Sequence, residues 1–445
     1  MTAVNPASDY SRREQITIIV SCMLGFALDL YDVLILPFIM GSIQKSLNIS
    51  LTYVASITSV TLIGSVIGGA VFGAIGDKLG RKNALQLTLA VFAVGSIASA
   101  FSWNYWSLAA LRFITGIGLG GEWGAGMVLF NEAWNKDRRG LGSAFIQGSA
   151  VLASASASIV GIWAITSFSQ DWGWRVALLT GGSPIILMVF IRFFMPESKI
   201  WSEFDAKRRR GDVPVTIQRE NTLIAMFRGP LFRISIISLI WMMAYMFFYY
   251  AIIVFLPTLM LKVMNTPPDV VRTTSVIVSI VGGITYITMG WLNDRLGRRF
   301  GALIPSTFWL ISLGGIYLYS HHLYSGVLLA WPFLWIYILF AMGNTSLGVV
   351  GTWLSELYPV DVRATAVSTI YMAGRAVGSI APVVVPMIAA YAGDNLVMGL
   401  MIALPAGLMF ILCTLLLPET RGRDLAGTAR VPVEAPGSSA SSFAH

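Results

Sequence analysis

Charged side chains are scarce in this 445-residue sequence. Only 12% of the residues are Asp, Glu, Lys or Arg, whereas 56% are hydrophobic. A soluble domain usually contains about 25% charged residues. This deficit excludes an ordinary soluble globular protein and indicates that lipid surrounds most of the chain.

Cysteine and histidine are also scarce, and familiar catalytic motifs are missing. Cys22 and Cys413 both lie in apolar stretches, so they predict neither a disulfide framework nor a metal site. His321 and His322 lie in or beside a loop, and His445 ends the chain. No HExxH, GxSxG or nucleotide-binding loop occurs. The sequence therefore predicts no enzyme and no cofactor.

Long apolar stretches make up most of the sequence that remains. A helix that crosses a bilayer needs about 20 mostly apolar residues, and a lone strand would leave backbone groups unsatisfied in lipid. The predicted fold is therefore an all-α membrane protein with twelve transmembrane helices. The predicted spans are 15–40, 54–75, 83–101, 104–130, 141–166, 174–195, 231–260, 272–293, 299–320, 327–354, 364–391 and 395–418.

The positive charges gather on one side of these spans. Of the 30 Lys and Arg residues, 24 fall in the N-terminus, the even-numbered loops, the adjoining helix ends or the tail. This distribution places both termini in the cytoplasm of a cell whose inner membrane holds the protein. The net charge of +8 then predicts a bilayer partner and no nucleic acid. The remaining six residues are Lys45, Arg175, Lys262 and Arg272 on the other side, and Arg112 and Arg375 within spans.

Three short motifs occur twice, in the same order. GAIGDKLGRK at 73–82 returns as GWLNDRLGRR at 290–299, and MPES at 195–198 returns as LPET at 417–420. Between them, Glu132, Asp137 and Arg139 return as Glu356, Asp361 and Arg363. The repeats predict two halves of six helices, a plan in which transporters bind substrate between the halves.

The repeats divide the chain into five parts. The polar segment between the halves contains KRRRGD, a basic run suited to the anionic inner leaflet. The tail is rich in Ala, Ser, Pro and Gly, which is typical of disorder. The predicted parts are a cytoplasmic N-terminus at 1–14, an N-terminal half at 15–196, a linker at 197–230, a C-terminal half at 231–418 and a tail at 419–445.

With these two D-x-L-G-R-[KR] loops, the chain resembles the major facilitator superfamily of secondary transporters from residue 15 to about 425. The loops match the signature cytoplasmic loop of that superfamily. Asp77 and Asp294 each lie beside a glycine-permitted turn, where a carboxylate can meet Arg side chains or a helix N-terminus. We expect such ion pairs to stabilise the outward-open state and to break when the inside opens. The gating candidates are Asp77, Arg81, Asp294, Arg298, Glu132, Arg139, Glu356 and Arg363.

Three acids lie well inside the predicted spans: Asp29, Asp32 and Glu122. A charge at mid-membrane costs about 2.5 to 3.5 kcal/mol on insertion scales, so such residues indicate function. Asp29 and Asp32 project about 60° apart on one helix, and two close carboxylates hold a proton more readily than one. We therefore predict that they couple transport to protons. The alternative is a static pair in which Arg112 neutralises the acids. Glu122 is either a proton relay or a satisfied structural carboxylate.

Arg375 lies close to the centre of the eleventh span, without an acid on its own helix. A guanidinium suits a carboxylate, so we expect a substrate carboxylate as its partner. The alternative partners are Glu122 and backbone carbonyl groups. Arg112 is a second basic candidate in the fourth span. The remaining candidates for the substrate pocket are Asn344, Tyr371, Tyr249 and Trp123.

Several motifs together resemble the bacterial carboxylate:proton symporters, including the sialate/lactate, aromatic-acid and metabolite branches. These are DLYD in the first span, GGEWG in the fourth, GWR at 173–175 and the central Arg of the eleventh. The resemblance implies that Asp29 and Asp32 carry protons and that Arg375 holds the organic anion, with Glu122 and Arg112 as further members. DLYDV departs from the metabolite branch, and GGEWG departs from the aromatic-acid branch.

The expected function is proton-coupled uptake of a small organic monocarboxylate, such as lactate or pyruvate, by a monomer with alternating access. An aromatic acid and sialic acid are alternative substrates. A drug/proton antiporter would carry a Gly-Pro motif in the fifth span, and a sugar carrier would carry paired glutamines in the seventh; this chain has neither. A sensor would need a sizeable soluble domain, for which the linker and tail are too short.

Overall fold

The computed structural model of the chain describes residues 10–49, 51–213, 220–256, 259–319 and 330–425. Within these ranges all regular secondary structure is helical. The predicted tail beyond residue 425 lies outside the described residues, as do His321, His322 and His445.

The first half of the chain forms four long helices and then several shorter ones. α1 starts with a capping box in which the Ser11 side chain accepts from Glu14 N and the Glu14 side chain accepts from Ser11 N. The helices are α1 (Arg12–Leu47), α2 (Leu51–Leu79), α3 (Arg81–Ser99), α4 (Tyr105–Ala133), the short η2 (Lys136–Arg138), α5 (Arg139–Gly148), α6 (Ala150–Ser167), α7 (Gln170–Thr180) and α8 (Pro184–Phe194).

The second half follows a similar order after a helical linker. The linker contains α9 (Lys199–Arg210) and α11 (Thr222–Ala225), neither of which the sequence analysis predicted. The later helices are α12 (Leu231–Ile253), the π-turn η3 (Leu259–Val263), α14 (Pro268–Leu296), α15 (Arg298–Leu318), α17 (Ala330–Asn344), α18 (Leu347–Leu357), α19 (Arg363–Gly378), α20 (Ala381–Tyr391), α21 (Leu396–Leu400) and α22 (Ala403–Leu416).

Eleven helical segments of the described chain are long and apolar enough to cross a membrane. They correspond to eleven of the twelve predicted spans. α3 occupies the place of the remaining span but is not among the eleven. Its first two turns carry Lys82, Asn83 and Gln86, which lower its mean hydropathy. Its position beside α4, against which it packs closely, is nevertheless that of a member of the bundle.

Several predicted spans are pairs of helices with a break between them. Pro184 starts α8, and a proline lacks the N–H that an uninterrupted helix would use. The tenth span breaks after α17, which frees the backbone carbonyl of Asn344. Two hydroxyl groups satisfy it: Tyr245 donates at 2.8 Å and Tyr286 at 3.1 Å. Irregular backbone at membrane depth therefore has protein partners here, as a bilayer requires.

The glycine-rich α4 lies in the middle of the first half. A side chain at Gly120 would overlap the Ser65 carbonyl oxygen of α2, and one at Gly118 would overlap the backbone of Phe92 on α3. The absence of a Cβ atom thus lets α4 lie directly against both neighbours. This close approach buries the polar residues of α4 deep in the protein.

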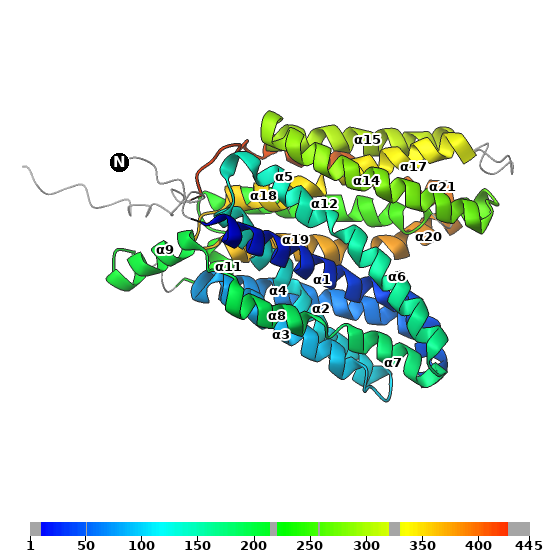
Figure 1. The fold of residues 1–445 in the computed structure, drawn as a ribbon. Coiled ribbons are helices and arrows are strands. Elements are labelled where there is room, and N and C mark those ends of the chain that lie inside the picture. The colour runs from blue at the N-terminus through cyan, green and yellow to red at the C-terminus, as the bar shows by residue number, and fades with distance from the viewer. Residues whose placement is uncertain (1–9, 50, 214–219, 257–258, 320–329, 426–445) are drawn as a thin grey trace, which may run out of the picture.

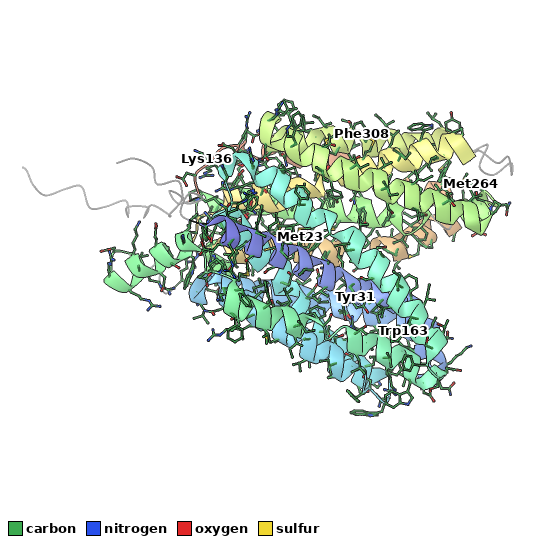
Figure 2. The ribbon with its side chains drawn as sticks, viewed as in Figure 1. Met23, Tyr31, Lys136, Trp163, Met264 and Phe308 are labelled. Carbon is green, nitrogen blue, oxygen red and sulfur yellow. The ribbon has the colours of Figure 1, made fainter. Side chains whose placement is uncertain are left out.

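Figure 1 shows the two halves close together at one end and spread apart at the other. We call the first the linker end, because α9 and α11 lie there, and the second the far end. Lys136 lies at the linker end, whereas Trp163 of the first half and Met264 of the second lie apart near the far end (Figure 2). Close packing of α19 on α2 and of α14 on α5 connects the halves.

Candidate functional site

The first ion pair within the bundle joins the two halves. Asp29 on α1 and Arg375 on α19 are both buried, and Arg375 Nη1 donates to Asp29 Oδ2 at 3.0 Å and to Oδ1 at 3.4 Å. The sequence analysis named Glu122, backbone carbonyls or a substrate as partners of Arg375; the structure gives Asp29. Removing one partner of such a pair leaves an uncompensated buried charge. The pair therefore connects the halves as long as both groups are charged.

The second ion pair lies within the first half. Arg112 on α4 donates from Nη1 and Nη2 to the two oxygens of Asp32, at 3.0 and 2.6 Å. Ser96 Oγ donates to the same carboxylate at 2.9 Å. The contact between Asp32 and Arg112 that the sequence left open is confirmed. Asp29 and Asp32 thus each form an ion pair with a different arginine.

Glu122 is the third acid of the site, and no arginine or lysine of the described residues forms an ion pair with it. It is 1% exposed, and its Oε2 has no hydrogen-bond partner within the described residues. Its Oε1 lies against Gly25 of α1, where any side chain would overlap it. Glu122 also interacts electrostatically with Asp29 and Arg375. Burying a charged carboxylate is costly unless it is paired and hydrogen-bonded, so Glu122 is a candidate for a functional role.

Two aromatic rings meet across the halves beside the first ion pair. The Trp123 ring of α4 stacks on the Tyr371 ring of α19, with centroids 3.6 Å apart and planes 13° apart. Tyr371 precedes Arg375 by four residues, so the two share one face of α19. Trp123 Nε1 donates to Gln147 of α5 at 3.1 Å, and Gln147 Nε2 donates to the Leu347 carbonyl of the second half at 3.4 Å.

Tyrosines extend this region into the second half. Tyr245 donates to Asn344 Oδ1 at 2.6 Å, and Asn344 Nδ2 donates to the Tyr286 hydroxyl at 3.3 Å. Tyr249 and Tyr250 are half-buried, and their ring centroids lie 5.3 Å apart. Four predicted pocket residues, Asn344, Tyr371, Tyr249 and Trp123, therefore lie in or beside one polar and aromatic region together with Arg375. Arg112 is the exception, because it binds Asp32 within the first half.

The sequence analysis missed several members of this region. Tyr250 lies against α19, where a side chain at Gly378 would overlap its ring, and it interacts electrostatically with Arg375. Gln147, Tyr245 and Tyr286 were missed as well. The available signal was weak: an amide or hydroxyl within an apolar span is common, and only the tertiary structure brings these groups together.

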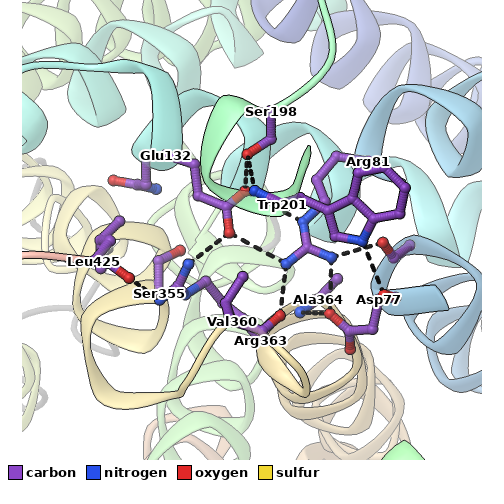
Figure 3. A network of polar contacts seen from close by, with 12 residues as sticks. Asp77, Arg81, Glu132, Ser198, Trp201, Ser355, Val360, Arg363, Ala364 and Leu425 are labelled. Atoms are coloured by element: carbon purple, nitrogen blue, oxygen red, sulfur yellow. Dashed lines mark hydrogen bonds and ion pairs between the residues drawn. The ribbon is translucent and has the colours of Figure 1, made fainter. Parts of the chain in front are cut away.

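A second charged region lies at the linker end (Figure 3). Asp77 accepts hydrogen bonds from Arg81 at 3.0 Å and from the backbone N–H groups of Ala364 and Thr365 at 3.0 and 2.8 Å. These N–H groups form the N-terminus of α19, where the helix dipole favours an anion. Glu132 accepts from Arg81 and also from Arg363 of the second half, at 3.2 and 2.5 Å.

The other copy of this motif makes the same kinds of contact. Asp294 accepts from Arg298 at 2.9 Å and from Gly140 N and Leu141 N, at the start of α5, at 2.7 and 2.9 Å. Glu356 accepts from Arg298 at 2.8 Å and lies 3.7 Å from Arg139. The expected contacts of both acids with an arginine and a helix N-terminus are confirmed. Each acid reaches a helix of the opposite half.

The glycines of the two loops have positive φ angles, as a turn between two helices at this point requires. Gly80 has φ 104° and Gly297 has φ 103°. At each turn a glutamate of the repeated MPES and LPET motifs, to which the sequence analysis gave no role, accepts from the start of the following helix. Glu197 Oε1 accepts from Arg81 N at 2.9 Å, and Glu419 Oε1 accepts from Arg298 N at 2.8 Å.

These two glutamates, which lie outside the membrane-spanning segments, differ in acidity. Burial raises the pKa of Glu197, and hydrogen bonds from the N–H groups of Ser198 and Lys82 offset this only in part. Burial acts in the same direction on Glu419, but N–H donors from Arg299, Arg298 and the residues after it hold its pKa below the usual value. The two turns therefore match in geometry and differ in charge stabilisation.

Known proteins resemble the chain in sequence and in structure. Residues 18–431 match the sugar (and other) transporter family. A Haemophilus influenzae protein named as a metabolite transport protein is 31% identical over 92% of this chain and 97% of its own length. The sialic acid transporter NanX of Escherichia coli is 27% identical over 84% and 87%, and the niacin transporter NiaP of Acinetobacter baylyi is 28% identical over 90% and 93%.

A solved structure of the major facilitator proton:xylose symporter XylE, bound to 6-bromo-6-deoxy-D-glucose, has the same fold. Its TM-score is 0.73 at 19% identity, and the match covers 94% of this chain and 98% of the other. The duplicated loops, the helical halves and these matches agree with one another. The chain is a multi-pass membrane transporter, not an enzyme, and it belongs to the sugar (and other) transporter family of the major facilitator superfamily.

Proposed function

We propose that this transporter takes up a small organic monocarboxylate together with protons across the inner membrane. The observation that carries the proposal is the buried pair of Asp29 and Arg375. It places a carboxylate on the arginine that we expect to bind the carboxylate of the substrate. The internal acid and the substrate are then competitors for one guanidinium.

This competition couples the proton to the substrate. When Asp29 takes up a proton, it loses the charge that holds it to Arg375. The substrate carboxylate then replaces it and restores the ion pair that a buried guanidinium needs. When the substrate leaves, Arg375 is again uncompensated until Asp29 releases its proton. Each ligand favours the binding of the other, which is the condition for symport.

Glu122 supports a second proton-binding position. It is buried near the first pair and lacks a partner within the described residues, so its charged form is unfavourable in the substrate-free protein. Asp32 is less suited to this role in the described state, because Arg112 neutralises it bidentately. One proton with one monoanion carries no net charge, whereas a second proton adds about 2.3 kcal/mol per 100 mV.

The distribution of positive charge supports a cytoplasmic linker end, with both termini on that side and twelve spans in the bilayer. The contacts of Asp77 and Asp294 close this end. The described conformation is then one that faces outward, in which an external anion and an external proton arrive at the pair of Asp29 and Arg375. Opening of the linker end would release both into the cytoplasm, and one chain contains the complete path.

The names of the relatives support an acidic substrate. Sialic acid and niacin are both carboxylic acids, and transporters with these names align with most of the chain. Lactate and pyruvate are small members of the proposed class. The aromatic rings around Arg375 favour a second candidate, a planar aromatic acid, because Trp123, Tyr371 and Tyr250 can contact the face or edge of its ring.

The test is uptake into proteoliposomes that contain the purified transporter. An inward proton gradient is imposed, and lactate, pyruvate, benzoate, niacin and sialate are offered in turn. We expect at least one acid to accumulate, and a protonophore to abolish the accumulation. Accumulation that a protonophore leaves unchanged would overturn proton coupling, and failure of every acid would overturn the proposed substrate class.

Variants separate coupling from binding. With Asp29→Asn, we expect concentrative uptake to disappear while exchange of labelled for unlabelled substrate continues, because Arg375 is free to bind an anion. With Arg375→Lys, the charge stays but the planar fork is lost, so the apparent affinity should fall at least tenfold. Asp212→Asn, an exposed acid after α9, is the matched control and should transport like the parent.

A further inference from the structure

A hollow of about 700 Å³ lies on the outer side of the first half at the linker end. Its walls come from α3 and α8, which pack against each other, and from the ends of α2 and α9. It contains none of the residues of the site between the halves. Its volume lies within the usual range of sites that bind small molecules.

One end of this groove is basic. Four cations line it: Lys78 from α2, Arg192 from α8, and Arg208 and Arg209 from α9. Arg208 and Arg209 both contact Asp205. Neither Lys78 nor Arg192 belongs to any of the ion pairs between described residues.

The positive charge of the groove also acts on Lys82, which lies beside it. Lys82 lies in the first turn of α3, outside the membrane-spanning segments. Burial lowers its pKa, the positive charge of Arg192 lowers it further, and Glu197 partly offsets both effects. Several positive charges therefore lie close together at one place, which favours an anion beside them.

The other end of the groove is apolar. Leu87 of α3 and Val189 and Phe193 of α8 line it and are 45%, 48% and 75% exposed. Between the two ends, the Gln86 side-chain nitrogen is buried without a hydrogen-bond partner in the described residues. A ligand that fits must therefore have an anionic group, a hydrogen-bond acceptor and an apolar chain, in that order.

α9 fixes the shape of the basic end. Trp201 Nε1 donates to the Asp77 carbonyl at 2.9 Å, and an Arg208 guanidinium nitrogen donates to the Lys78 carbonyl at 3.1 Å. Ser198 caps the helix by accepting from Trp201 N. The cations of α9 are thus attached to the end of α2 and do not depend on a ligand for their position.

We propose that this groove binds one anionic phospholipid of the cytoplasmic leaflet. Its phosphate lies between Lys78 and Arg192, its ester oxygens accept from Gln86, and one acyl chain follows Leu87, Val189 and Phe193. Basic pockets between helices on the cytoplasmic side suit such headgroups. The proposal rests on the cytoplasmic placement of the linker end and is independent of the transported substrate.

The test uses the full chain, purified in detergent and freed of lipid. Dioleoylphosphatidylglycerol or dioleoylphosphatidylcholine is added, and the bound lipid is counted by native mass spectrometry. We expect the anionic lipid to bind in preference, and the double variant Lys78→Gln/Arg192→Gln to weaken its binding by roughly ten- to thirtyfold. Equal binding of both lipids by the parent chain would overturn the proposal.

Lys136→Gln/Arg138→Gln is the matched control. It removes the same charge at the linker end, and Lys136 lies on the side of the bundle away from α9 (Figure 2). We expect it to bind the anionic lipid like the parent; an equal loss would mean that the charges attract lipid without a site. Ala90→Trp keeps every cation and fills the apolar end, so it should also weaken binding. Competition by glycerol 3-phosphate at the same concentration as the lipid would assign the site to a soluble phosphate instead.

Discussion

The two charged regions of the molecule differ in symmetry. At the linker end, the acids and arginines occur once in each half, and Asp77 and Asp294 make matching contacts with the opposite half. Within the bundle, the charged residues Arg112 and Glu122 of the first half and Arg375 of the second have no charged counterpart in the other half. The repeat positions of Arg112, Glu122 and Arg375 are Ile336, Ser346 and Val151, all without charge.

This difference separates charged residues that the fold requires from charged residues that it does not require. The duplicated contacts belong to the architecture, because both halves must close against each other in the same way. The unmatched charges are not needed by that architecture, since the other half folds with apolar or small polar residues at the same places. Buried charge that the scaffold does not require is costly, which is why we propose a role in transport for these residues.

The largest effect is expected at the unmatched pair of Asp29 and Arg375. Arg375→Gln leaves a buried carboxylate without its partner, so we expect a loss of about 3 to 5 kcal/mol in the free energy of unfolding and no uptake. Asp29→Asn/Arg375→Gln removes both charges and should regain most of the stability but none of the transport. The measurements are denaturant unfolding in detergent and proteoliposome uptake.

The double variant decides how the pair acts. If it unfolds as easily as Arg375→Gln alone, the arginine stabilises the fold through other contacts and the competition for its guanidinium is not the reason for its presence. Asp212→Asn serves again as the control for both measurements, because this acid is exposed and lies outside the bundle.

A smaller effect, equal in the two halves, is expected at the linker end. Asp77→Asn and Asp294→Asn each weaken hydrogen bonds between a charged carboxylate and the N-terminus of a helix, worth about 1.5 to 3 kcal/mol each. We expect both variants to open the linker end to a similar extent and the double variant to open it further. The measurement is alkylation of a cysteine placed at Ala144, which lies against Gly290 of the second half.

The alkylation assay uses a chain in which Cys22 and Cys413, both buried, are replaced by alanine. Asp137→Asn is the control, because this exposed acid also belongs to the repeated motif but its carboxylate makes no hydrogen bond or ion pair with the opposite half in the described residues. A strong response to one substitution and none to the other would contradict the equivalence of the two copies.

The sequence was sufficient for some features of this comparison and insufficient for others. The contacts of Asp77 and Asp294 could be predicted because a local motif with a glycine turn occurs twice. Arg375 could be singled out because a charge in an apolar span is rare. Its pairing with Asp29 could not, because it depends on how helices 346 positions apart pack together.

Other features depend on contacts between segments that are far apart in the sequence. Glu197 accepts from α3, more than a hundred residues earlier in the chain, and no local pattern marks it as the cap of that helix. The linker was predicted only as a polar, basic segment. Its composition gave no sign that Trp201 would attach α9 to α2 by a hydrogen bond. The helix breaks lie at prolines and small polar residues. The side chains that bind the freed carbonyl groups, such as Tyr245, could not be predicted, because they come from other helices.

A still smaller effect is expected at the stack of Trp123 on Tyr371, where the halves contact each other through aromatic rings and not through charges. Tyr371→Phe keeps the ring that stacks on Trp123, so uptake should change less than about threefold. Tyr371→Leu removes the stack, which is worth about 0.5 to 1.5 kcal/mol, and should lower uptake up to about tenfold. Equal uptake rates in the two variants would show that the ring itself has no role.

The smallest effect is expected at Glu197 and Glu419, where the two copies differ in acidity. The folded-state pKa of Glu419 is lowered, so it stabilises the protein above its unfolded pKa, and this contribution is lost as the pH falls through the folded value. The folded-state pKa of Glu197 is raised, so the folded protein loses stability as the pH rises from the unfolded value to the folded one.

Substitution by glutamine should therefore change the pH dependence of stability with opposite signs. The stability of Glu419→Gln should fall further below that of the parent at neutral pH than at acidic pH. The stability of Glu197→Gln, measured relative to the parent, should be higher at neutral pH than at acidic pH. The measurement is the thermal midpoint in detergent across about two pH units on either side of 4.3, the usual pKa of glutamate. Because all other titrating groups are common to parent and variant, each difference isolates one carboxylate. Two differences of the same sign would mean that the caps are equivalent and that the symmetry of the linker end extends to its charge.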